Sequence, residues 1–277
     1  MKNSILLLLI VFSFSLSSFA QDIEKIKGDR NVTIEQTYID GFKKIVVSED
    51  FSVELFYNKK PSVEIETDGN LHEHIDIKVI DSVLTITSSR EIRSKKLNIK
   101  VNYGDAFSDI EVKDNGEVRS LTSLELGNST LKTSGSARAY LNIKANSFNF
   151  VSTEKAKVKL NVTATNVAVE ISDNTKMDAL INATEVKMDL YQRANAVIEG
   201  TITNLNLRAD NNSQLNGTNF TTTTCTVLAE LDCNVYLEVL DAITIDASGA
   251  SEIYLFGNPK ITINTFTGTV KLQKKAK

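Results

Sequence analysis

The sequence predicts an all-β protein built mainly as a β-solenoid, a single-stranded parallel β-helix with about 19 residues in each rung. The first observation behind this prediction is an apolar pattern that returns at a constant interval as far as Leu205, after which each interval differs by a single residue. The positions in this series are Ile110, Ser129, Phe148, Val167, Val186, Leu205, Cys225, Ile243 and Ile261. A second apolar series follows two positions later, because alternate residues of a strand point to the same face.

The second observation is a fixed place for small side chains in every repeat. Large inward residues lie before and after a turn, and a small one comes directly after it. These small residues are Ala137, Ala156, Thr175, Ala194, Ser213, Cys233 and Ser251. A column of small side chains predicts a corner where the coil is narrow. Long runs of Val, Ile, Thr, Asn and Ser without the periodicity of a helix also favour strands.

Residues 1–20 are predicted to be a cleaved signal peptide. Lys2 supplies a positive start, Ile5 to Phe14 form an apolar run, and Ser18-Phe19-Ala20 resembles a cleavage site. The run is about half of the roughly 20 residues that a membrane span needs, and no second such run follows. We therefore expect cleavage before Gln21, no transmembrane segment, and export to the periplasm, the cell surface or the extracellular space. An uncleaved N-terminal anchor is the alternative.

The charge of the mature chain argues against nucleic acid as a partner. Lys2 is the only charged residue in the predicted signal peptide, so cleavage would leave 30 basic and 35 acidic residues, a formal charge of −5. Binding to phosphates requires concentrated Lys and Arg. We therefore expect no nucleic-acid interface.

The remaining chain is predicted to form one continuous domain over residues 38–272. Residues 21–37 are interpreted as a flexible lead-in or edge segment, residues 38–109 as an N-terminal β cap with the first irregular rungs, and residues 110–272 as regular rungs. Residues 273–277 form a short basic tail. A cap is expected on physical grounds, because the end rung of a solenoid exposes unpaired backbone and an open apolar core.

Histidine and cysteine give only weak indications of a special site. His72 and His74 would share a face on a strand, but a metal site needs a third ligand, so we favour a solvated connection between strands. Cys225 and Cys233 lie in one repeat, and both are expected to point inward. They could form a disulfide in an oxidising compartment or remain two small buried residues. We predict no metal and no cofactor.

The turns between strands offer the best candidates for ligand contacts. Exported β-helices include polysaccharide lyases and hydrolases, which need carboxylates with an Arg or Lys on neighbouring rungs. Glu154 and Asp173 share one register, Arg193 lies beside it, and Asp210 follows higher in the stack. Solvated turns are also rich in such residues, so this edge predicts speculative ligand contacts and no catalytic residue.

Exposed columns of Thr and Asn could bind sugars or a protein partner, and they equally suit a polar outer face. Tyr191, Tyr236 and Tyr254 could stack on sugars. They do not form a regular column in the phase of the repeat, which weakens the case for a carbohydrate ligand.

Several segments resemble the DUF2807 family, also described as the putative auto-transporter adhesin, head GIN domain. Gly41-Phe42-Lys43-Lys44-Ile45 and Phe51-Ser52-Val53-Glu54-Leu55 look like its opening, Ser134-Gly135-Ser136-Ala137 and Ser248-Gly249-Ala250-Ser251 like its turns, and Ile253 to Pro259 like its ending. The resemblance covers about residues 41–272, and in the middle repeats other residues replace the glycines of the turns. It implies an exported protein of the kind common in Bacteroidetes, with a right-handed parallel β-helix, and supplies no catalytic residues.

These observations favour a non-enzymatic exported β-helix that serves as an adhesin-like binding or structural module of the cell envelope. The alternative is a carbohydrate-active enzyme, either a polysaccharide lyase or a hydrolase, that uses the edge with Glu154, Asp173 and Arg193. A glycan or an envelope protein is a candidate partner, and the end rungs could pair between chains to give a homodimer. The position of the acidic side chains distinguishes the two functions, because an enzyme needs them on the floor of a concave groove.

Overall fold

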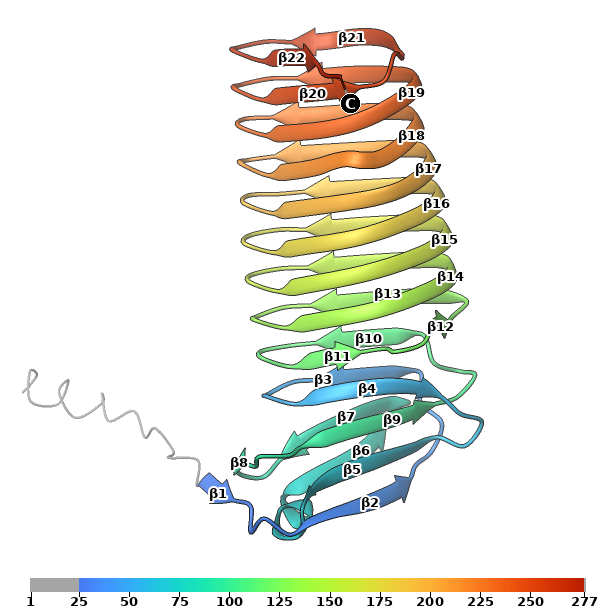
Figure 1. Ribbon diagram of the computed structural model, residues 1–277, viewed down its shortest axis with the longest axis vertical. Helices are drawn as coiled ribbons and strands as arrows, with labels where there is room; N and C mark the ends of the chain where they lie inside the picture. Colours follow the sequence, from blue (N-terminus) through green and yellow to red (C-terminus); the bar gives the residue numbers. More distant parts are fainter. Residues whose placement is uncertain (1–24, 277) are drawn as a thin grey trace, which may run out of the picture.

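A computed structural model describes residues 25–276 and shows a β-solenoid of about nine turns with rungs of about 19 residues (Figure 1). The predicted signal peptide, the first residues of the predicted lead-in and Lys277 lie outside the described residues. The rungs stack into a column with strand β2 at one end and strands β21 and β22 at the other (Figure 1). The predicted fold class is therefore confirmed.

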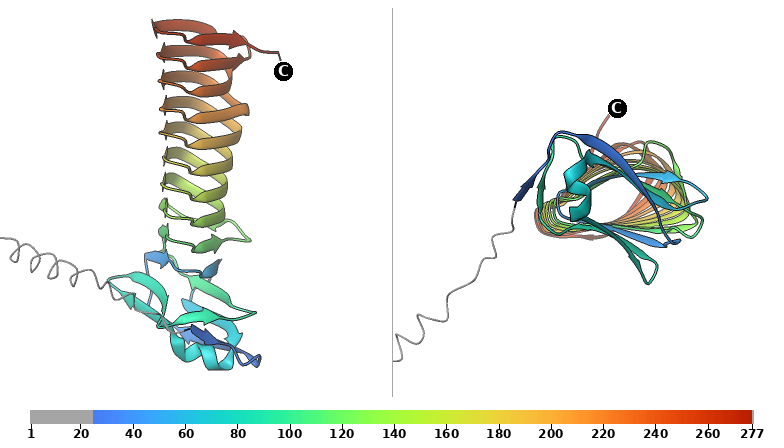
Figure 2. Two further views of the ribbon diagram at one scale, coloured as in Figure 1. Left: turned by 90° about the vertical axis from the view of Figure 1, so that its left-hand side faces the viewer. Right: turned by 90° about the horizontal axis from the view of Figure 1, so that it is seen from below.

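Each rung consists of two strand segments that are joined by a tight turn at one edge and a bend at the other. In the middle of the column a single long strand runs around the bend, so that its first half lies on one sheet and its second half on the other (Figure 2). We call the sheet that follows the turn side A and the sheet that precedes it side B. The long strands are β14 (Arg138–Ser152), β15 (Lys157–Ile171), β16 (Lys176–Leu190), β17 (Asn195–Asp210), β18 (Gln214–Glu230) and β19 (Asn234–Ala247).

Shorter strands complete the column above and below. Side A also contains β11 (Glu117–Arg119), β20 (Glu252–Phe256) and β22 (Lys271–Lys274), and side B contains β10 (Asp109–Val112), β13 (Asn128–Thr133) and β21 (Lys260–Phe266). Strand β12 (Leu124–Glu125) pairs with β14 near the bend. All of these strands pair in parallel with the rung before or after them.

The register confirms the predicted spacing except at its first step. Leu205 lies beside Cys225, and Cys225 beside Ile243, as the repeat predicts. Ile110, however, pairs with Leu131 and not with Ser129, so the first interval is two residues longer than predicted. The reason is the connection between β11 and β13, which contains β12 and adds residues that apolar periodicity alone does not reveal.

The predicted corner of small side chains is present. All seven of its residues are fully buried at the turn edge of the core, and they are Ala137, Ala156, Thr175, Ala194, Ser213, Cys233 and Ser251. Beside this column the Thr133 hydroxyl donates a hydrogen bond of 2.6 Å to Ser152 Oγ, which lies 3.3 Å from Thr175 Oγ1. These three buried hydroxyl groups therefore satisfy one another along the axis, as is usual for buried polar groups.

The N-terminal end changes from parallel to antiparallel pairing. Strands β3 (Lys44–Val47) and β4 (Ser52–Tyr57) form a rung below β10 and β11, and β7 (Val83–Ser88) and β9 (Asn98–Tyr103) pair in parallel beneath it. Antiparallel strands β6 (Ile75–Ile80) and β5 (Ser62–Asp68) follow, with the 3-10 helix η1 (Gly69–His74) between them. Leu71 of η1 is fully buried, so this helix helps to close the core.

Part of the segment predicted to be a flexible lead-in or an edge segment is an edge strand. Strand β2 (Val32–Tyr38) pairs antiparallel with β5 along its whole length and is the outermost strand at the N-terminal end. Strand β1 (Lys25–Lys27) pairs in parallel with β8 (Glu91–Arg93). The sequence could not decide between these alternatives because β2 buries little, and a strand that is exposed on both faces lacks the alternation by which strands are identified. The basic tail is also shorter than predicted, since β22 extends to Lys274.

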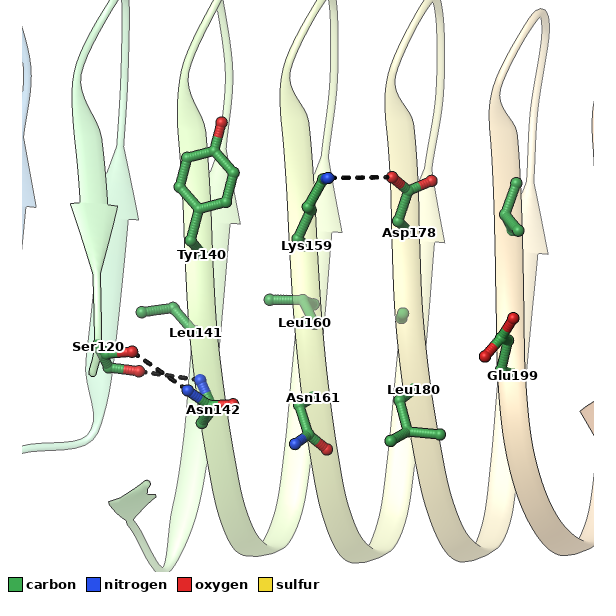
Figure 3. Close-up of a pocket in the computed structure, with 12 residues that line it drawn as sticks. Ser120, Tyr140, Leu141, Asn142, Lys159, Leu160, Asn161, Asp178, Leu180 and Glu199 are labelled. Carbon is green, nitrogen blue, oxygen red and sulfur yellow. Dashed lines mark hydrogen bonds and ion pairs between the residues drawn. The ribbon is translucent and has the colours of Figure 1, made fainter. Parts of the chain in front are cut away.

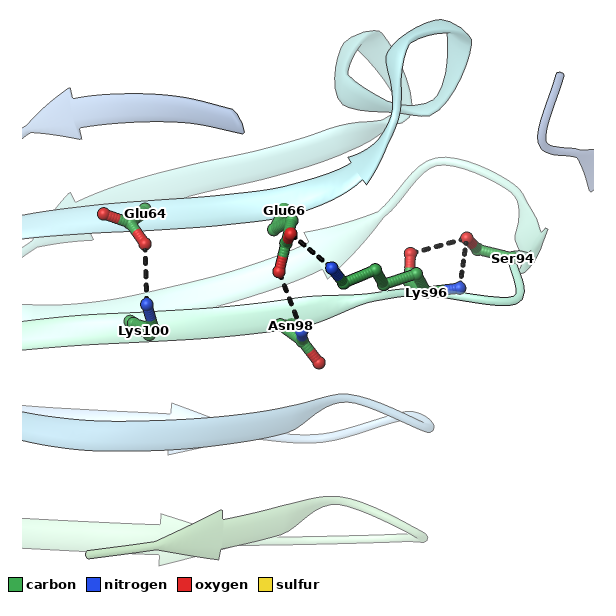
Figure 4. Close-up of polar contacts among 6 residues, drawn as sticks. All are labelled: Glu64, Glu66, Ser94, Lys96, Asn98 and Lys100. Atoms are coloured by element: carbon green, nitrogen blue, oxygen red, sulfur yellow. Dashed lines mark hydrogen bonds and ion pairs between the residues drawn. The ribbon is translucent and has the colours of Figure 1, made fainter. Parts of the chain in front are cut away.

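Salt bridges on the outer face of the cap align β5 with β9. Lys100 Nζ lies 3.0 Å from Glu64 Oε1, and Asn98 Nδ2 donates a hydrogen bond of 2.9 Å to Glu66 Oε2 (Figure 4). Lys96 also donates to Glu66, and this hydrogen bond is the main reason that the pKa of Glu66 lies below its usual value. Because these pairs are solvated, they fix the register of the two strands more than they stabilise the fold.

Candidate binding groove on side A

A groove of about 640 Å³ lies on the outer surface of side A, across the strands from β11 to β17. Two outward columns form it, because every second residue of each strand points away from the core. One column contains Tyr140, Lys159, Asp178 and Val197, and the other contains Asn142, Asn161, Leu180 and Glu199 (Figure 3). The groove therefore runs along the axis of the solenoid, with one residue from each column on every rung.

The groove combines apolar and polar surface. Leu180 is 41% exposed and Val197 is 37% exposed, although both are large aliphatic residues. The two asparagines of the second column, Asn142 and Asn161, lie on the rungs below Leu180 (Figure 3). Lys159 Nζ and Asp178 Oδ2 lie 4.0 Å apart, so both charges remain available to a ligand. Such a surface suits a ligand that presents both apolar and hydrogen-bonding groups.

The lower end of the groove is held by fixed side chains. Ser120 Oγ accepts a hydrogen bond of 2.9 Å from the backbone N–H of Asn142, and Asn142 Nδ2 donates one of 3.2 Å to the Ser120 carbonyl oxygen (Figure 3). The Arg119 guanidinium lies 4.8 Å from the centre of the Tyr140 ring. Burial alone would raise the pKa of Glu117, but hydrogen bonds from Arg119 and Arg138 keep it below its usual value. Arg119 is thereby fixed over Tyr140.

The upper end of the groove coincides with an irregularity of the solenoid. The register of β17 against β18 shifts between Val197 and Glu199, which is the signature of a β-bulge. Gly200 follows with φ of 118°, and a Cβ atom there would lie only 2.1 Å from the Ile181 carbonyl oxygen. Glycine is therefore required at this position, and the bulge ends the regular pair of columns at Glu199.

The turn-edge residues predicted as ligand contacts are only partly brought together. Glu154 and Asp173 line a shallow hollow of about 380 Å³ at the turn edge. Asp173 Oδ2 accepts hydrogen bonds of 3.1 Å from the Glu154 backbone N–H and from the Ser172 hydroxyl. This carboxylate therefore stabilises two neighbouring turns. Arg193 Nε donates a hydrogen bond of 3.0 Å to Asn174 Oδ1.

Asp210 belongs to a different cluster. Arg208 Nη2 lies 3.3 Å from Asp210 Oδ2 and 3.3 Å from Glu230 Oε2, and its guanidinium lies 5.5 Å from the centre of the Tyr191 ring. The four predicted contacts therefore do not converge on one point. Glu154 and Asp173, which in the sequence most resembled a catalytic pair, lie along the turns rather than in the groove on side A.

Two of the three tyrosines considered as sugar-stacking residues lie side by side. Tyr236 and Tyr254 are register partners on neighbouring strands of side A, and their rings stack with centroids 4.3 Å apart. Tyr191 lies elsewhere, against Arg208. The three tyrosines do not form one column because Tyr191 directly follows β16 at the start of a turn, whereas Tyr236 and Tyr254 lie within strands of side A. The stack does not provide an open sugar platform, since Lys275 Nζ lies 5.0 Å from the centre of the Tyr254 ring.

The cysteines and histidines are held within the fold. Cys225 and Cys233 are both free and buried in the structure, and burial raises the pKa of each thiol. His72 and His74 lie in η1, the connection between β5 and β6, but their side chains are only 7% and 14% exposed, so the connection is less solvated than predicted. His72 Nε2 lies 3.0 Å from Thr33 Oγ1. Within residues 25–276 no three His, Cys, Asp or Glu side chains are placed to hold a metal ion.

Side B is also hollowed, and polar groups in the smaller of its two grooves hydrogen-bond to one another. Two adjoining grooves of about 750 and 440 Å³ share Glu185 and Lys187. Asn204 Nδ2 donates a hydrogen bond of 2.6 Å to Glu185 Oε1, and Thr224 Oγ1 donates one of 2.6 Å to Asn204 Oδ1. We prefer side A as the candidate site because its groove exposes two aliphatic side chains, Leu180 and Val197, at outward positions. The sequence held one signal for it, which is the presence of Leu180 and Val197 at outward positions of the repeat.

Comparisons with known proteins support one family. The model of the family described as "Putative auto-transporter adhesin, head GIN domain" (DUF2807) matches residues 41–180 and 152–259. A putative adhesin from Parabacteroides merdae has a similar structure, with a TM-score of 0.59 and 16% identity over 90% of this chain and 99% of that one. A putative lipid binding protein from Parabacteroides distasonis gives 0.59 and 15% over 90% and 99%.

A putative adhesin from Parabacteroides distasonis is similar as well, with a TM-score of 0.57 and 18% identity over 90% of this chain and 100% of that one. At these identities the three likenesses show a shared fold. No curated protein matches the chain. No helix among residues 25–276 is long and apolar enough to cross a membrane.

Proposed function

This chain belongs to the DUF2807 family, and from that premise we propose that it is an exported, non-enzymatic binding module of the cell envelope whose ligand lies in the groove on side A. The observation that carries the proposal is the exposure of Leu180 and Val197 beside Asn142 and Asn161, in a hollow that crosses several rungs. Solvated β-sheet faces normally turn polar residues outward. Two neighbouring aliphatic side chains at outward positions therefore support a binding surface.

The shape and composition of the groove indicate an elongated ligand that lies along the axis. Each rung adds one residue to each of the two columns, so successive units of the ligand would meet successive rungs at about 4.8 Å spacing. The asparagines supply both donors and acceptors, and Lys159 and Asp178 supply charges of both signs. A glycan or an extended segment of an envelope protein fits this description.

The carboxylates of the groove are the residues on which the enzymatic alternative would have to depend. Glycoside hydrolysis needs two carboxyl groups about 5–9.5 Å apart that flank one bond. The acidic residues of the groove on side A are Asp178 and Glu199, and they stand in different columns on successive rungs. Asp178 Oδ2 lies 4.0 Å from Lys159 Nζ, so this carboxylate faces a lysine on the neighbouring rung. No observation favours the carbohydrate-active alternative over the binding module.

A binding assay with the purified mature protein tests the proposal. The protein is applied to a glycan array and to immobilised envelope proteins, with lipid vesicles included because one structural neighbour is named a putative lipid binding protein. We expect a ligand whose binding is lost in Leu180→Asp and weakened in Tyr140→Ala. Leu231→Asp is the matched control, because Leu231 is an exposed leucine at the turn edge, outside the groove.

The results separate the parts of the proposal. Binding that survives Leu180→Asp but is lost in Leu231→Asp would place the ligand at the turn edge instead. Product analysis by mass spectrometry follows for every glycan that binds, and a cleaved glycan would contradict a non-enzymatic role. Sequencing of the exported protein from its N-terminus tests export separately, and the expected first residue is Gln21.

A further inference from the structure

Strand β2 is an open edge without the lysines, prolines or bulges that commonly protect edge strands from pairing with another strand. It pairs with β5 on one side only, and no other strand of the described chain pairs with it. Figure 2 shows β2 crossing the N-terminal end of the molecule on its outside. An unpaired edge presents N–H and C=O groups that can bind a further strand.

The backbone groups at this edge can be identified from the pairing with β5. Gly69 N–H donates a hydrogen bond of 2.9 Å to the Asn31 carbonyl oxygen, and Ile39 N–H donates one of 3.2 Å to that of Pro61. In an antiparallel pair, successive residues turn their backbone groups to opposite sides. Odd-numbered residues of this strand therefore bond to β5, and Val32, Ile34, Gln36 and Tyr38 direct their N–H and C=O groups to the free edge.

Three of these four residues are also large hydrophobic residues with exposed side chains. Val32 is 43% exposed, Ile34 61% and Tyr38 69%. Their side chains lie on the outer face, because Thr33, Glu35 and Thr37 are the register partners of the inward residues of β5. Free backbone groups and an apolar row thus coincide on one strand.

The other outer strands of the molecule carry features that discourage pairing. Strand β6 contains Lys78, and β22 contains Lys271 and Lys274. Strand β21 has a register shift of the kind made by a β-bulge. Lysines and bulges are the common protections of edge strands. Strand β2 has no Lys, no Pro and an uninterrupted register over seven residues.

The sequence of β2 is nearly complementary to itself in an antiparallel arrangement. With a two-fold axis at Glu35, Val32 would lie opposite Tyr38 of a second copy, and Thr33 opposite Thr37. Ile34 would lie opposite Gln36. Pairs of an aromatic with a β-branched residue and pairs of threonines are favourable across antiparallel strands. The free N–H and C=O groups of all four residues in each copy would then be hydrogen-bonded.

We infer that two copies of this protein associate through β2, by antiparallel edge pairing centred on Glu35, into a dimer joined at the N-terminal ends. The interface is isologous, as a two-fold dimer requires. It is built on one strand from each copy, so we expect reversible association. The two Glu35 carboxylates oppose each other, and each has His72 nearby, with Nδ1 of the ring 3.8 Å from Glu35 Oε2.

Sedimentation of the purified mature protein over a range of concentrations tests the dimer. We expect a monomer–dimer equilibrium that Ile34→Lys shifts to monomer and that Glu35→Gln shifts several-fold toward dimer. Ile80→Lys is the matched control, since it places the same charge at an exposed isoleucine of another outer strand, β6. A protein that remains monomeric at every concentration, or a dimer that survives Ile34→Lys, overturns the proposal.

Single cysteines test the register. In the proposed pairing Glu35 lies opposite Glu35 of the second copy, at a non-hydrogen-bonded position. The two Cα atoms are then about 4.5 Å apart, which is within the range of a disulfide. Glu35→Cys should therefore give a cross-linked dimer on mild oxidation. Thr33→Cys should not, because its copies would lie about 13 Å apart. A mixture of the Thr33→Cys and Thr37→Cys proteins should cross-link. Equal cross-linking of Glu35→Cys and Thr33→Cys alone contradicts the register and the proposal.

Discussion

The rings of Tyr236 and Tyr254 stack on the outer face of side A with their planes 12° apart, and the Tyr254 hydroxyl donates a hydrogen bond to Glu252. These two residues occupy the same position on successive rungs. The stack shows how a solenoid brings residues that are separated by a whole rung of sequence into direct contact. The hydrogen bond to Glu252 also makes the ionisation of Tyr254 unusual.

We expect Tyr254 to ionise with a pKa of about 12, above the ordinary value of 10.0, mainly because its hydroxyl is bonded to Glu252. Since the folded-state pKa is raised, the folded chain keeps a proton that the unfolded chain releases above pH ~10. The contribution to stability is present below that pH and is lost as the pH rises toward 12. The difference in ultraviolet absorbance between the protein and Tyr254→Phe measures this titration, and Glu252→Gln should return the pKa toward its ordinary value.

Substitution of neighbouring residues on β19 should separate the core from the surface. Ile245 is fully buried, so Ile245→Asp places a carboxylate in the core at a cost of several kcal/mol and should prevent stable folding. Asp246 points outward and accepts a hydrogen bond of 3.2 Å from Asn264, which is exposed to solvent. Asp246→Ser should therefore change the melting temperature very little. Circular dichroism on heating compares the two, and a similar loss in both would contradict the assignment of inward and outward positions.

Replacement of Leu231 by glycine should stabilise the protein. Leu231 has φ of 64°, a conformation that costs a residue with a Cβ atom about 1–2 kcal/mol. The side chain is 55% exposed, so little burial is lost. After subtraction of the greater chain entropy of glycine, we expect a gain of about 0.5–1 kcal/mol in the free energy of unfolding. Denaturant titration measures it.

Asp232→Gly is the control for this substitution. Asp232 follows Leu231 in the same turn but does not have a positive φ, so glycine there brings no relief and should destabilise the protein slightly. Equal effects at the two positions would show that backbone conformation does not govern stability in this turn.

The two cysteines should be unreactive in the folded protein. Both are buried, and burial raises the pKa of their thiols, so neither is accessible or readily ionised near neutral pH. A thiol reagent should label them only after unfolding. Leu231→Cys supplies an exposed thiol for comparison and should react at once. Two thiols that remain unlabelled after unfolding without reductant would instead indicate a disulfide between Cys225 and Cys233.

Much of the fold follows from local patterns that the sequence states directly. Alternation identifies inward residues such as Ile243 and Ile245, and the small residues from Ala137 to Ser251 place the narrow corner. Patterns of this kind fail where the repeat changes length, as between Ile110 and Leu131, or where both faces of a strand are exposed, as in β2. Apolar periodicity identifies the residues that are buried. It therefore does not reveal the extra residues of a connection or a strand that is exposed on both faces.

The candidate site was less accessible to such patterns. Sequence alone placed Glu154, Asp173, Arg193 and Asp210 at the turn edge, but it could not tell which of them share a partner. Asp210 binds Arg208, which comes from the adjoining part of the same strand, and Asp173 binds the turn that contains Glu154. Side-chain direction and the curvature of the sheet decide such contacts, and neither is encoded by spacing.

By itself, then, the sequence determined that the chain is a β-solenoid, which residues fill its core and where its turns lie, because burial of alternate apolar residues recurs with a fixed period. Only the tertiary structure decided which outward residues meet on successive rungs, where the surface is hollow, and which edge strand remains unpaired. Tyr236 contacts Tyr254, and Leu180 and Val197 line one groove, because stacking brings together residues that are one rung apart in the sequence. No local rule constrains the identities of such residues. Strand β2 has an open edge because it pairs with β5 alone.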